Sequence, residues 1–126
     1  MRLKTEDGTG DADLWFTGFV GPQGGIAWWD LYDRGDLVGV IEWLGDGQGN
    51  AHLGLSALDG PHAGSGISWL FTEEGAARVD AVDGATAEHA WVQHNPDDSG
   101  EVRLPDFNEG EPACWDVDLT NTPCDP

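Results

Sequence analysis

Residues 26–44 read IAWWDLYDRGDLVGVIEWL and have the pattern of a β-hairpin. Two segments rich in aromatic and β-branched residues, which favour strands, flank the sequence Asp33-Arg34-Gly35-Asp36. Gly35 can adopt the positive φ that a two-residue hairpin turn requires. With Arg34 and Gly35 as the turn, the expected register places Trp28 opposite Ile41 and Asp30 opposite Gly39.

This register predicts that Asp30 lies on an apolar face. Side chains alternate along a strand, so Trp28, Asp30 and Tyr32 share one face, and the register adds Trp43 to it. If that face lines a barrel interior, Asp30 is desolvated, as a general acid or base commonly is. If the face is outward, Asp30 is solvated and Trp28 is partly exposed.

A second candidate catalytic residue lies on the following strand. His52 and Ser56 share a face there, and one pairing of the two strands brings them to the side of Asp30. We therefore predict Asp30 and His52 as catalytic candidates, although no nucleophile motif accompanies them. The candidate ligand-binding side chains are the aromatic residues of the hairpin, Trp28, Trp29, Tyr32 and Trp43.

The hairpin also carries a family resemblance. The residues Asp30-Leu31-Tyr32-Asp33, followed by Gly35 and Gly39, resemble the early hairpin of small cyclase barrels related to allene oxide cyclases. The resemblance covers this hairpin and does not continue downstream.

Turn signals recur along the rest of the chain. The 126 residues include 19 glycines, and Gly-, Asp- or Pro-containing turns separate short apolar segments. Residues 73–81 could form a short helix, which Gly75 disfavours. The sequence predicts a single all-β antiparallel domain of eight or nine strands, an up-and-down barrel with a β-sandwich as the alternative. The expected strands are 13–20, 25–33, 37–44, 51–58, 66–73, 78–82, 86–94, 101–104 and 113–120.

The two cysteines lie in the last part of the chain. Residues 105–126 are expected to form an irregular extension containing the last strand, with Cys114 and Cys124 joined by a disulfide. A disulfide implies an oxidising compartment, outside the cell or in its envelope, and removal of a leader or another export route. The alternative is two free thiols in the cytoplasm of a salt-adapted organism.

The charge excludes some partners and suggests others. Against 24 Asp and Glu residues stand five Lys and Arg, a formal charge of −19. This argues against nucleic-acid binding through phosphate neutralisation and against a polybasic membrane anchor, and no apolar run is long enough to span a membrane. The acidity suits solubility in salt, a basic partner or a divalent cation. Asp7, Asp11 and Asp13 are the candidate Ca²⁺ ligands, without EF-hand spacing.

The sequence is compatible with three classes of function. The first is a non-enzymatic binding protein that engages a basic protein surface or a carbohydrate through negative charge and exposed aromatics, as an inhibitor, immunity factor, nucleic-acid mimic or carbohydrate-binding module. The second is a small barrel enzyme or carrier that uses Asp30 on an apolar substrate. The third is a structural shell or cement component. No cofactor is expected apart from the Ca²⁺ alternative, and the oligomeric state stays open.

Overall fold

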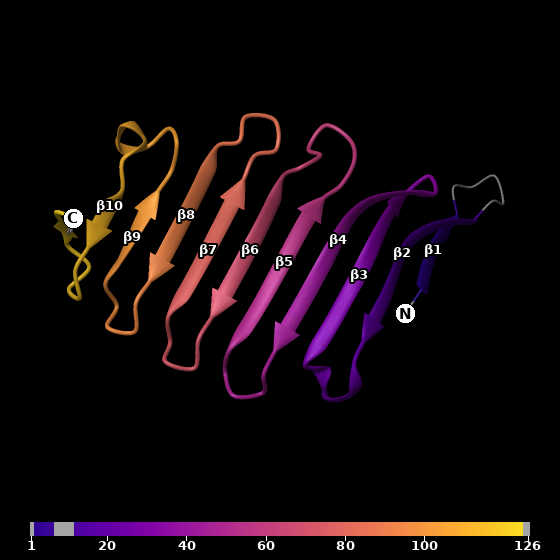
Figure 1. Ribbon diagram of the computed structural model, residues 1–126, viewed down its shortest axis with the longest axis horizontal. Coiled ribbons are helices and arrows are strands. Elements are labelled where there is room, and N and C mark those ends of the chain that lie inside the picture. Colours follow the sequence, from indigo (N-terminus) through magenta and orange to yellow (C-terminus); the bar gives the residue numbers. More distant parts are fainter. Residues whose placement is uncertain (1, 7–11, 125–126) are drawn as a thin grey trace.

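The strands lie side by side in sequence order and form one antiparallel sheet (Figure 1). The structure, a computed structural model, describes residues 2–6 and 12–124, with side chains from residue 15 onward. Its elements are β1 (Arg2–Glu6), β2 (Ala12–Val20), η1 (Pro22–Gly24), β3 (Ile26–Asp33), β4 (Asp36–Gly45), β5 (Ala51–Ala57), β6 (Gly66–Phe71), β7 (Ala77–Val82), β8 (His89–His94), β9 (Gly100–Arg103), η2 (Asn108–Gly110), β10 (Ala113–Trp115) and β11 (Asn121–Thr122).

Short connections produce this order, because each tight turn returns the chain beside the strand it has just left. At the β3–β4 turn, Arg34 has φ 50° and Gly35 has φ 94°. Positive φ at both central residues is the geometry whose twist matches that of the flanking strands. The expected all-β antiparallel domain and the hairpin turn at residues 34–35 are therefore confirmed.

The expected eight or nine strands are too few, because the described chain has eleven and the sequence analysis missed β1 and β11, and several boundaries also differ. The strand predicted over 113–120 ends at Trp115, because the Asp116 carboxylate accepts hydrogen bonds from the backbone N–H groups of Asp118 and Thr120 and closes a loop. The possible helix over 73–81 is a turn followed by β7, with Gly75 at φ 90°. In the described chain, no helix is long and apolar enough to cross a membrane.

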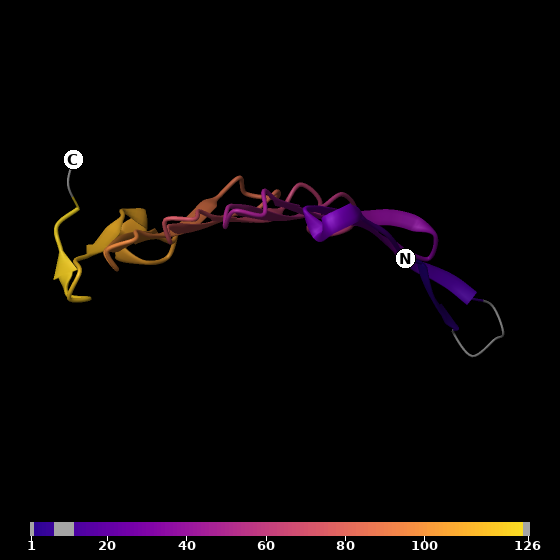
Figure 2. The same ribbon diagram turned by 90° about the horizontal axis from the view of Figure 1, so that it is seen from below.

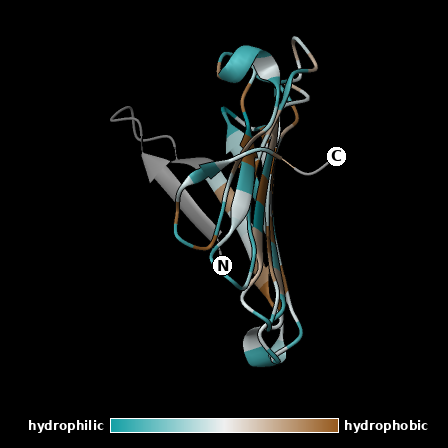
Figure 3. Ribbon diagram, turned by 90° about the vertical axis from the view of Figure 1, so that its left-hand side faces the viewer, coloured by the Kyte–Doolittle hydropathy of each residue, from teal (hydrophilic) through white to brown (hydrophobic). Residues whose placement is uncertain are grey.

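The predicted barrel is wrong, because the sheet is not closed. Its end strands, β1 and β11, have no partner on their outer sides within the described residues, and Figures 2 and 3 show a single, gently arched layer. Closure requires a stagger that accumulates from strand to strand. Here one row of paired residues, from Trp28 to Trp91, stays near the middle of most strands from β3 to β8. The alternative sandwich is also absent from the described chain, which has no second layer.

The pairing register gives the sheet two chemically different faces. Directly paired residues share a face, so Trp29, Ile41, Leu55, Ile67 and Ala81 lie in one row. We call this side the apolar face. From residue 15 onward its strand residues are Phe16, Gly18, Val20, Ala27, Trp29, Leu31, Gly39, Ile41, Trp43, Gly45, Ala51, Leu53, Leu55, Ala57, Ile67, Trp69, Phe71, Ala77, Val79, Ala81, Ala90, Val92, His94, Gly100, Val102, Ala113 and Trp115.

The opposite side, which we call the polar face, holds the charged strand residues. Trp28, Glu42, Ser68, Asp80 and Trp91 belong to one of its rows. Leaving aside Asp33 and Asp36 at the β3–β4 turn, the carboxylates of described strand side chains all lie here, and they are Asp30, Glu42, Asp80 and Glu101. Alternation therefore keeps these carboxylates off the apolar face, although the polar face also carries apolar side chains such as Trp28 and Leu70.

The apolar face has no cover within the chain. Ala27, 5% exposed, is the buried hydrophobic residue of the described part. Ile67 is 50% exposed, Leu55 42% and Trp69 39%. A sheet that carries its apolar side chains on one face ordinarily packs that face against a second layer. The described chain itself supplies no such second layer.

Candidate functional site

A β-bulge changes the surroundings predicted for Asp30. The pairs Tyr32–Leu37 and Asp33–Asp36 follow the expected register, but beyond them Leu31 pairs with Gly39, so Val38 is the extra residue. Asp30 consequently lies opposite Val40, and the expected pairing with Gly39 is wrong. A bulge next to a turn depends on how the neighbouring strand pairs, which no local pattern in the hairpin indicates.

The aromatic ligand-binding candidates divide between the two faces. Trp28 and Tyr32 share the polar face with Asp30, whereas Trp29 and Trp43 lie on the apolar face. Trp28 is 44% exposed and stacks on Phe19 with ring centroids 4.5 Å apart. The structure therefore does not bring the four side chains into one site.

The catalytic candidates share the polar face without making contact. Ser56 pairs with Val40, which pairs in turn with Asp30, so two strand spacings, about 10 Å, separate them. His52 lies four residues before Ser56 on β5, roughly 13 Å along the strand. Catalytic roles for Asp30 and His52 stay predictions.

The predicted Ca²⁺ ligands fall where the structure gives no side-chain positions. Asp7 and Asp11 lie outside the described residues, and the side chain of Asp13 is also outside them. Within the described part, no group of three or more His, Cys, Asp and Glu side chains is placed to hold a metal ion. The calcium alternative stays a prediction.

The polar face carries a network of charges around Asp80 that the sequence analysis missed. Arg78 donates from Nε and Nη2 to the two carboxylate oxygens of Asp80, at 2.8 and 2.9 Å. His89 Nε2 lies 2.8 Å from Asp80 Oδ1, and the Arg78 guanidinium lies 4.9 Å from the Trp91 ring centroid. The available signal was Arg78-x-Asp80, because two residues apart on a strand places both side chains on one face.

Asp80 is the carboxylate that this network stabilises. The hydrogen bonds from Arg78 have the largest effect and lower the pKa of Asp80. Burial raises this pKa, and the hydrogen bond with His89 lowers it further. The same contact raises the pKa of Arg78. Arg78 and Asp80 keep 34% and 27% of their side-chain surfaces exposed, so solvent screens the pair and its contribution to stability is about 0.5–1 kcal/mol.

We expect Asp80→Asn to lower the free energy of unfolding by about 0.5–1 kcal/mol at pH 7. A carboxylate with a lowered pKa in the folded state stabilises the fold above its unfolded pKa, about 3.9, and loses that contribution as the pH falls. Urea unfolding at pH 7 and at about pH 2.5 should therefore show a difference from wild type that disappears in acid. The control is Glu42→Gln in the same row, because Glu42 has no ion pair with a described side chain. A difference that persisted in acid would show that the network is not the cause.

An open hollow on the polar face is lined by several polar side chains. It has a volume of about 520 Å³, and its lining includes Glu42, His52, Ser56, Ser68 and Asp80. Gly54 on β5 and Gly66 on β6 also line the hollow, and because they have no side chains they leave space above the sheet. The hollow brings carboxylate, imidazole and hydroxyl groups to one surface without enclosing them.

Carboxylates also gather in the connections at both ends of the strands. These connections form the two long edges of the sheet (Figure 1). We call these edges the rims. The first rim contains the connections β3–β4, β5–β6, β7–β8 and β9–β10, with Asp33, Asp36, Asp59, Asp83, Glu88, Asp106, Glu109 and Glu111. The second rim contains β4–β5, β6–β7, β8–β9 and β10–β11, with Asp46, Glu73, Glu74, Asp97, Asp98, Asp116 and Asp118. Arg34 is the one Lys or Arg within these described connections.

Some rim carboxylates hold their own loops. Asp46 accepts hydrogen bonds from the backbone of Gln48 and Asn50, and Asp97 accepts them from the backbone and hydroxyl of Ser99. A side-chain hydrogen bond, from Asn50, Ser99 or Thr120 respectively, is the main cause that lowers the pKa of Asp46, Asp97 and Asp116. These carboxylates stay ionised well below neutral pH, so they contribute both to turn formation and to the negative rim.

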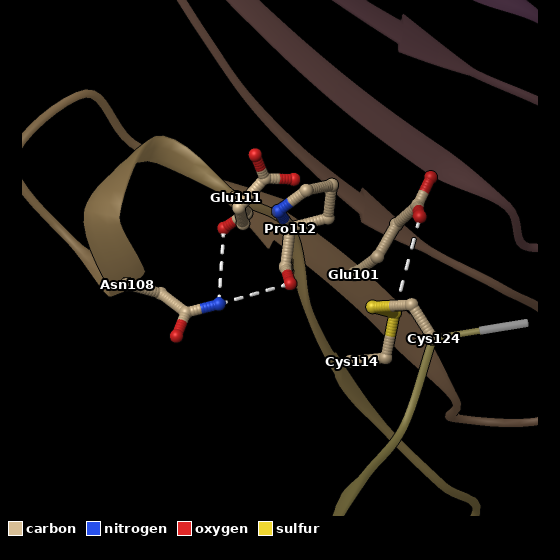
Figure 4. Close-up of a disulfide and its surroundings, with 6 residues drawn as sticks. All are labelled: Glu101, Asn108, Glu111, Pro112, Cys114 and Cys124. Atoms are coloured by element: carbon tan, nitrogen blue, oxygen red, sulfur yellow. Dashed lines mark hydrogen bonds between the residues drawn. A yellow bond between two sulfur atoms is a disulfide. The ribbon is translucent and has the colours of Figure 1, made fainter. Parts of the chain in front are cut away.

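The predicted disulfide between Cys114 and Cys124 is present (Figure 4). The two Cα atoms are 5.2 Å apart, and the bond ties the segment after β11 back to β10. Nearby, Asn108 Nδ2 donates to the carbonyl oxygens of Glu111 and Pro112, at 3.2 and 3.1 Å. These contacts fix the chain on both sides of β10, the last strand but one.

Comparison of this chain with protein-family models, with curated proteins and with solved structures found no match. The functional argument therefore depends on the two faces, the rims and their chemistry.

Proposed function

We propose that this protein is a non-enzymatic binding protein that engages a basic protein surface through the carboxylates of its rims. The observation that carries the proposal is the distribution of these carboxylates, which follow both rims with Arg34 as the one opposing Lys or Arg in the described connections. Successive connections on one rim are two strands apart, which spaces them by about 10 Å. From β3 to β8, strands of six to ten residues separate the rims by roughly 20–30 Å.

Such an arrangement suits a partner with an extended basic surface. A linear array of like charges attracts that surface over distances near the Debye length, about 8–10 Å, and speeds association. Turn formation explains Asp46, Asp97 and Asp116 but not Glu73, Glu74 or Asp118, whose carboxylates make no described hydrogen bond. The disulfide supports an oxidising location, outside the cell or in its envelope.

A charge-matched pair of triple variants tests the rim as the binding site. The second-rim variant is Glu73→Gln, Glu74→Gln and Asp118→Asn, and the control removes three carboxylates from the polar face through Asp30→Asn, Glu42→Gln and Glu101→Gln. We expect the rim variant to bind a ten-lysine peptide about tenfold more weakly than the control, from exposed charge contacts worth about 0.2–1 kcal/mol each. Titration calorimetry at about 20 mM and 300 mM salt measures the affinity.

Equal weakening of the two variants would contradict the proposal, because net charge alone would then explain the attraction. Circular dichroism establishes that both variants keep the strand content of the wild type. Binding unaffected by the higher salt would also count against the rims, since exposed charges are screened at that ionic strength.

The polar face favours one alternative, a carbohydrate-binding module. Trp28 and Trp91 lie at two ends of a row that includes Glu42, Ser68 and Asp80, the aromatic and polar groups on which sugars stack and hydrogen-bond. The carbohydrate alternative has less support than the rim proposal, because Phe19 covers the Trp28 ring and Arg78 covers the Trp91 ring. Oligosaccharide binding that is insensitive to salt and lost in Trp28→Ala would favour it over the rim proposal.

A further inference from the structure

The apolar face is a surface of the described chain that the rim proposal does not use. It extends from β2 to β10, and from residue 15 onward its strand residues include no Asp, Glu, Lys or Arg apart from the Asp33–Asp36 pair at the β3–β4 turn. Beyond this pair, its single ionisable side chain is His94, which pairs with Asp98 at 3.3 Å. A contiguous apolar surface of this extent marks an interface rather than an ordinary exposed face.

We propose that the apolar face is covered by a second copy of this chain, forming a face-to-face β-sandwich dimer. The first argument is area. The chain exposes 8750 Å², whereas a compact monomer of 13.5 kDa exposes about 6,500 Å². The excess is about 2,200 Å² per chain. Two copies that bury it remove about 4,400 Å² in total, within the range of obligate homodimers, about 2,000–5,000 Å².

The second argument is self-complementary shape. Large rings project from the apolar face on β3, β4 and β6, at Trp29, Trp43 and Trp69. On β7 and β8 the side chains are smaller, and Ala81 and Ala90 line a hollow of about 430 Å³ that extends to Leu55 on β5 and Ile67 on β6. A two-fold axis parallel to the strands near β6 reverses the strand order, so β4 of one copy lies over β8 of the other. The Trp43 ring of each copy then lies over β8 of its partner, where the apolar-face side chains include the smaller Ala90 and Val92.

The third argument is the placement of charge. Face-to-face packing leaves the polar faces and their carboxylates in water on the two outer surfaces, so no strand carboxylate of residues 15–115 outside the β3–β4 turn is desolvated. A basic partner would find no counter-charge on the apolar face. The rims of the two copies come within about 10 Å, the spacing of packed sheets, so their repulsion weakens the dimer at low salt.

The proposal goes beyond the rim proposal and does not depend on it, since the rims stay accessible in the dimer. Strand β6 provides a matched pair of positions for the test. Ile67 lies on the apolar face and is 50% exposed, and Leu70 lies on the polar face and is 48% exposed. Ile67→Arg and Leu70→Arg change hydrophobicity and net charge equally, so their difference reports the face.

Sedimentation equilibrium at about 150 mM salt measures the mass of each protein. We expect wild type and Leu70→Arg at twice the chain mass of 13.5 kDa, and Ile67→Arg to dissociate at least about 100-fold more readily, as for a buried unpaired charge. If Ile67→Arg does not fold, a wild-type unfolding temperature that rises with protein concentration supports the dimer. A folded wild-type monomer, a larger assembly, an Ile67→Arg dimer of unchanged affinity or a concentration-independent unfolding temperature would overturn the proposal.

Discussion

Replacing Gly100 with alanine should lower the free energy of unfolding by about 2–3 kcal/mol, the upper part of the range for overpacking. Gly100 is buried and begins β9, where it pairs with His94 on one side and Trp115 on the other. A Cβ atom there would overlap the carbonyl oxygen of Gln93 and the ring of Trp115. The backbone oxygen cannot move aside by a rotamer change, so the strand itself must shift.

Trp115 makes the position more sensitive. Its Nε1 donates to the carbonyl oxygen of Asp98 at 2.8 Å, so displacing the ring also weakens this hydrogen bond. Urea unfolding followed by circular dichroism measures the loss of stability. The matched control is Gly54→Ala on β5, where the nearest atom to a new Cβ is His52 Cε1, at 3.4 Å and on a side chain free to rotate. Equal stability of the two variants would contradict the packing described at Gly100.

Removing the disulfide should lower the free energy of unfolding by about 2–3 kcal/mol, as the chain-entropy model gives for a loop of this length. Cys114 and Cys124 are ten residues apart, and the bond holds the two-residue strand β11 beside β10. We expect the largest loss of hydrogen-exchange protection at Cys114 and Trp115, the β10 residues that pair with β11. Urea unfolding of oxidised and reduced protein measures the difference.

The double variant Cys114→Ala, Cys124→Ala provides the control for this experiment, because its stability should not respond to reductant. It should match the reduced wild-type protein to within about 0.5 kcal/mol. Reduction that left the stability of the wild type unchanged would show that the C-terminal segment is held by its other contacts.

Local patterns were sufficient to predict nine of the eleven described strands, all except β1 and β11. The positive φ at Gly35 and the alternation of side chains on either side of it depend only on residues close in sequence. The structure confirms the hairpin that they predict. The disulfide was predictable for a similar reason, because ten residues separate its two cysteines. The predicted strand that ends early does so at Asp116, whose loop-forming hydrogen bonds compete with strand pairing.

Closure of the sheet could not be predicted in the same way, because it depends on stagger accumulated over many strands. The neighbour of Asp30 was predicted wrongly because the extra residue Val38 shifts the register of β3 against β4 by one residue. The two faces are visible in the sequence as alternation within each strand. Which residues of neighbouring strands share a face depends on register, and one residue of slippage exchanges the faces of a whole strand.

The register of β3 against β4 is therefore the most direct test of the uncharged apolar face, on which the dimer proposal depends. Cross-strand NOEs in a NOESY spectrum measure it. The account predicts backbone contacts between the paired residues Trp29 and Ile41, and between Asp30 and Val40. Contacts that instead pair Asp30 with Gly39 and Trp28 with Ile41 would place Glu42 on the side of Trp29, and the apolar face would then carry a charge.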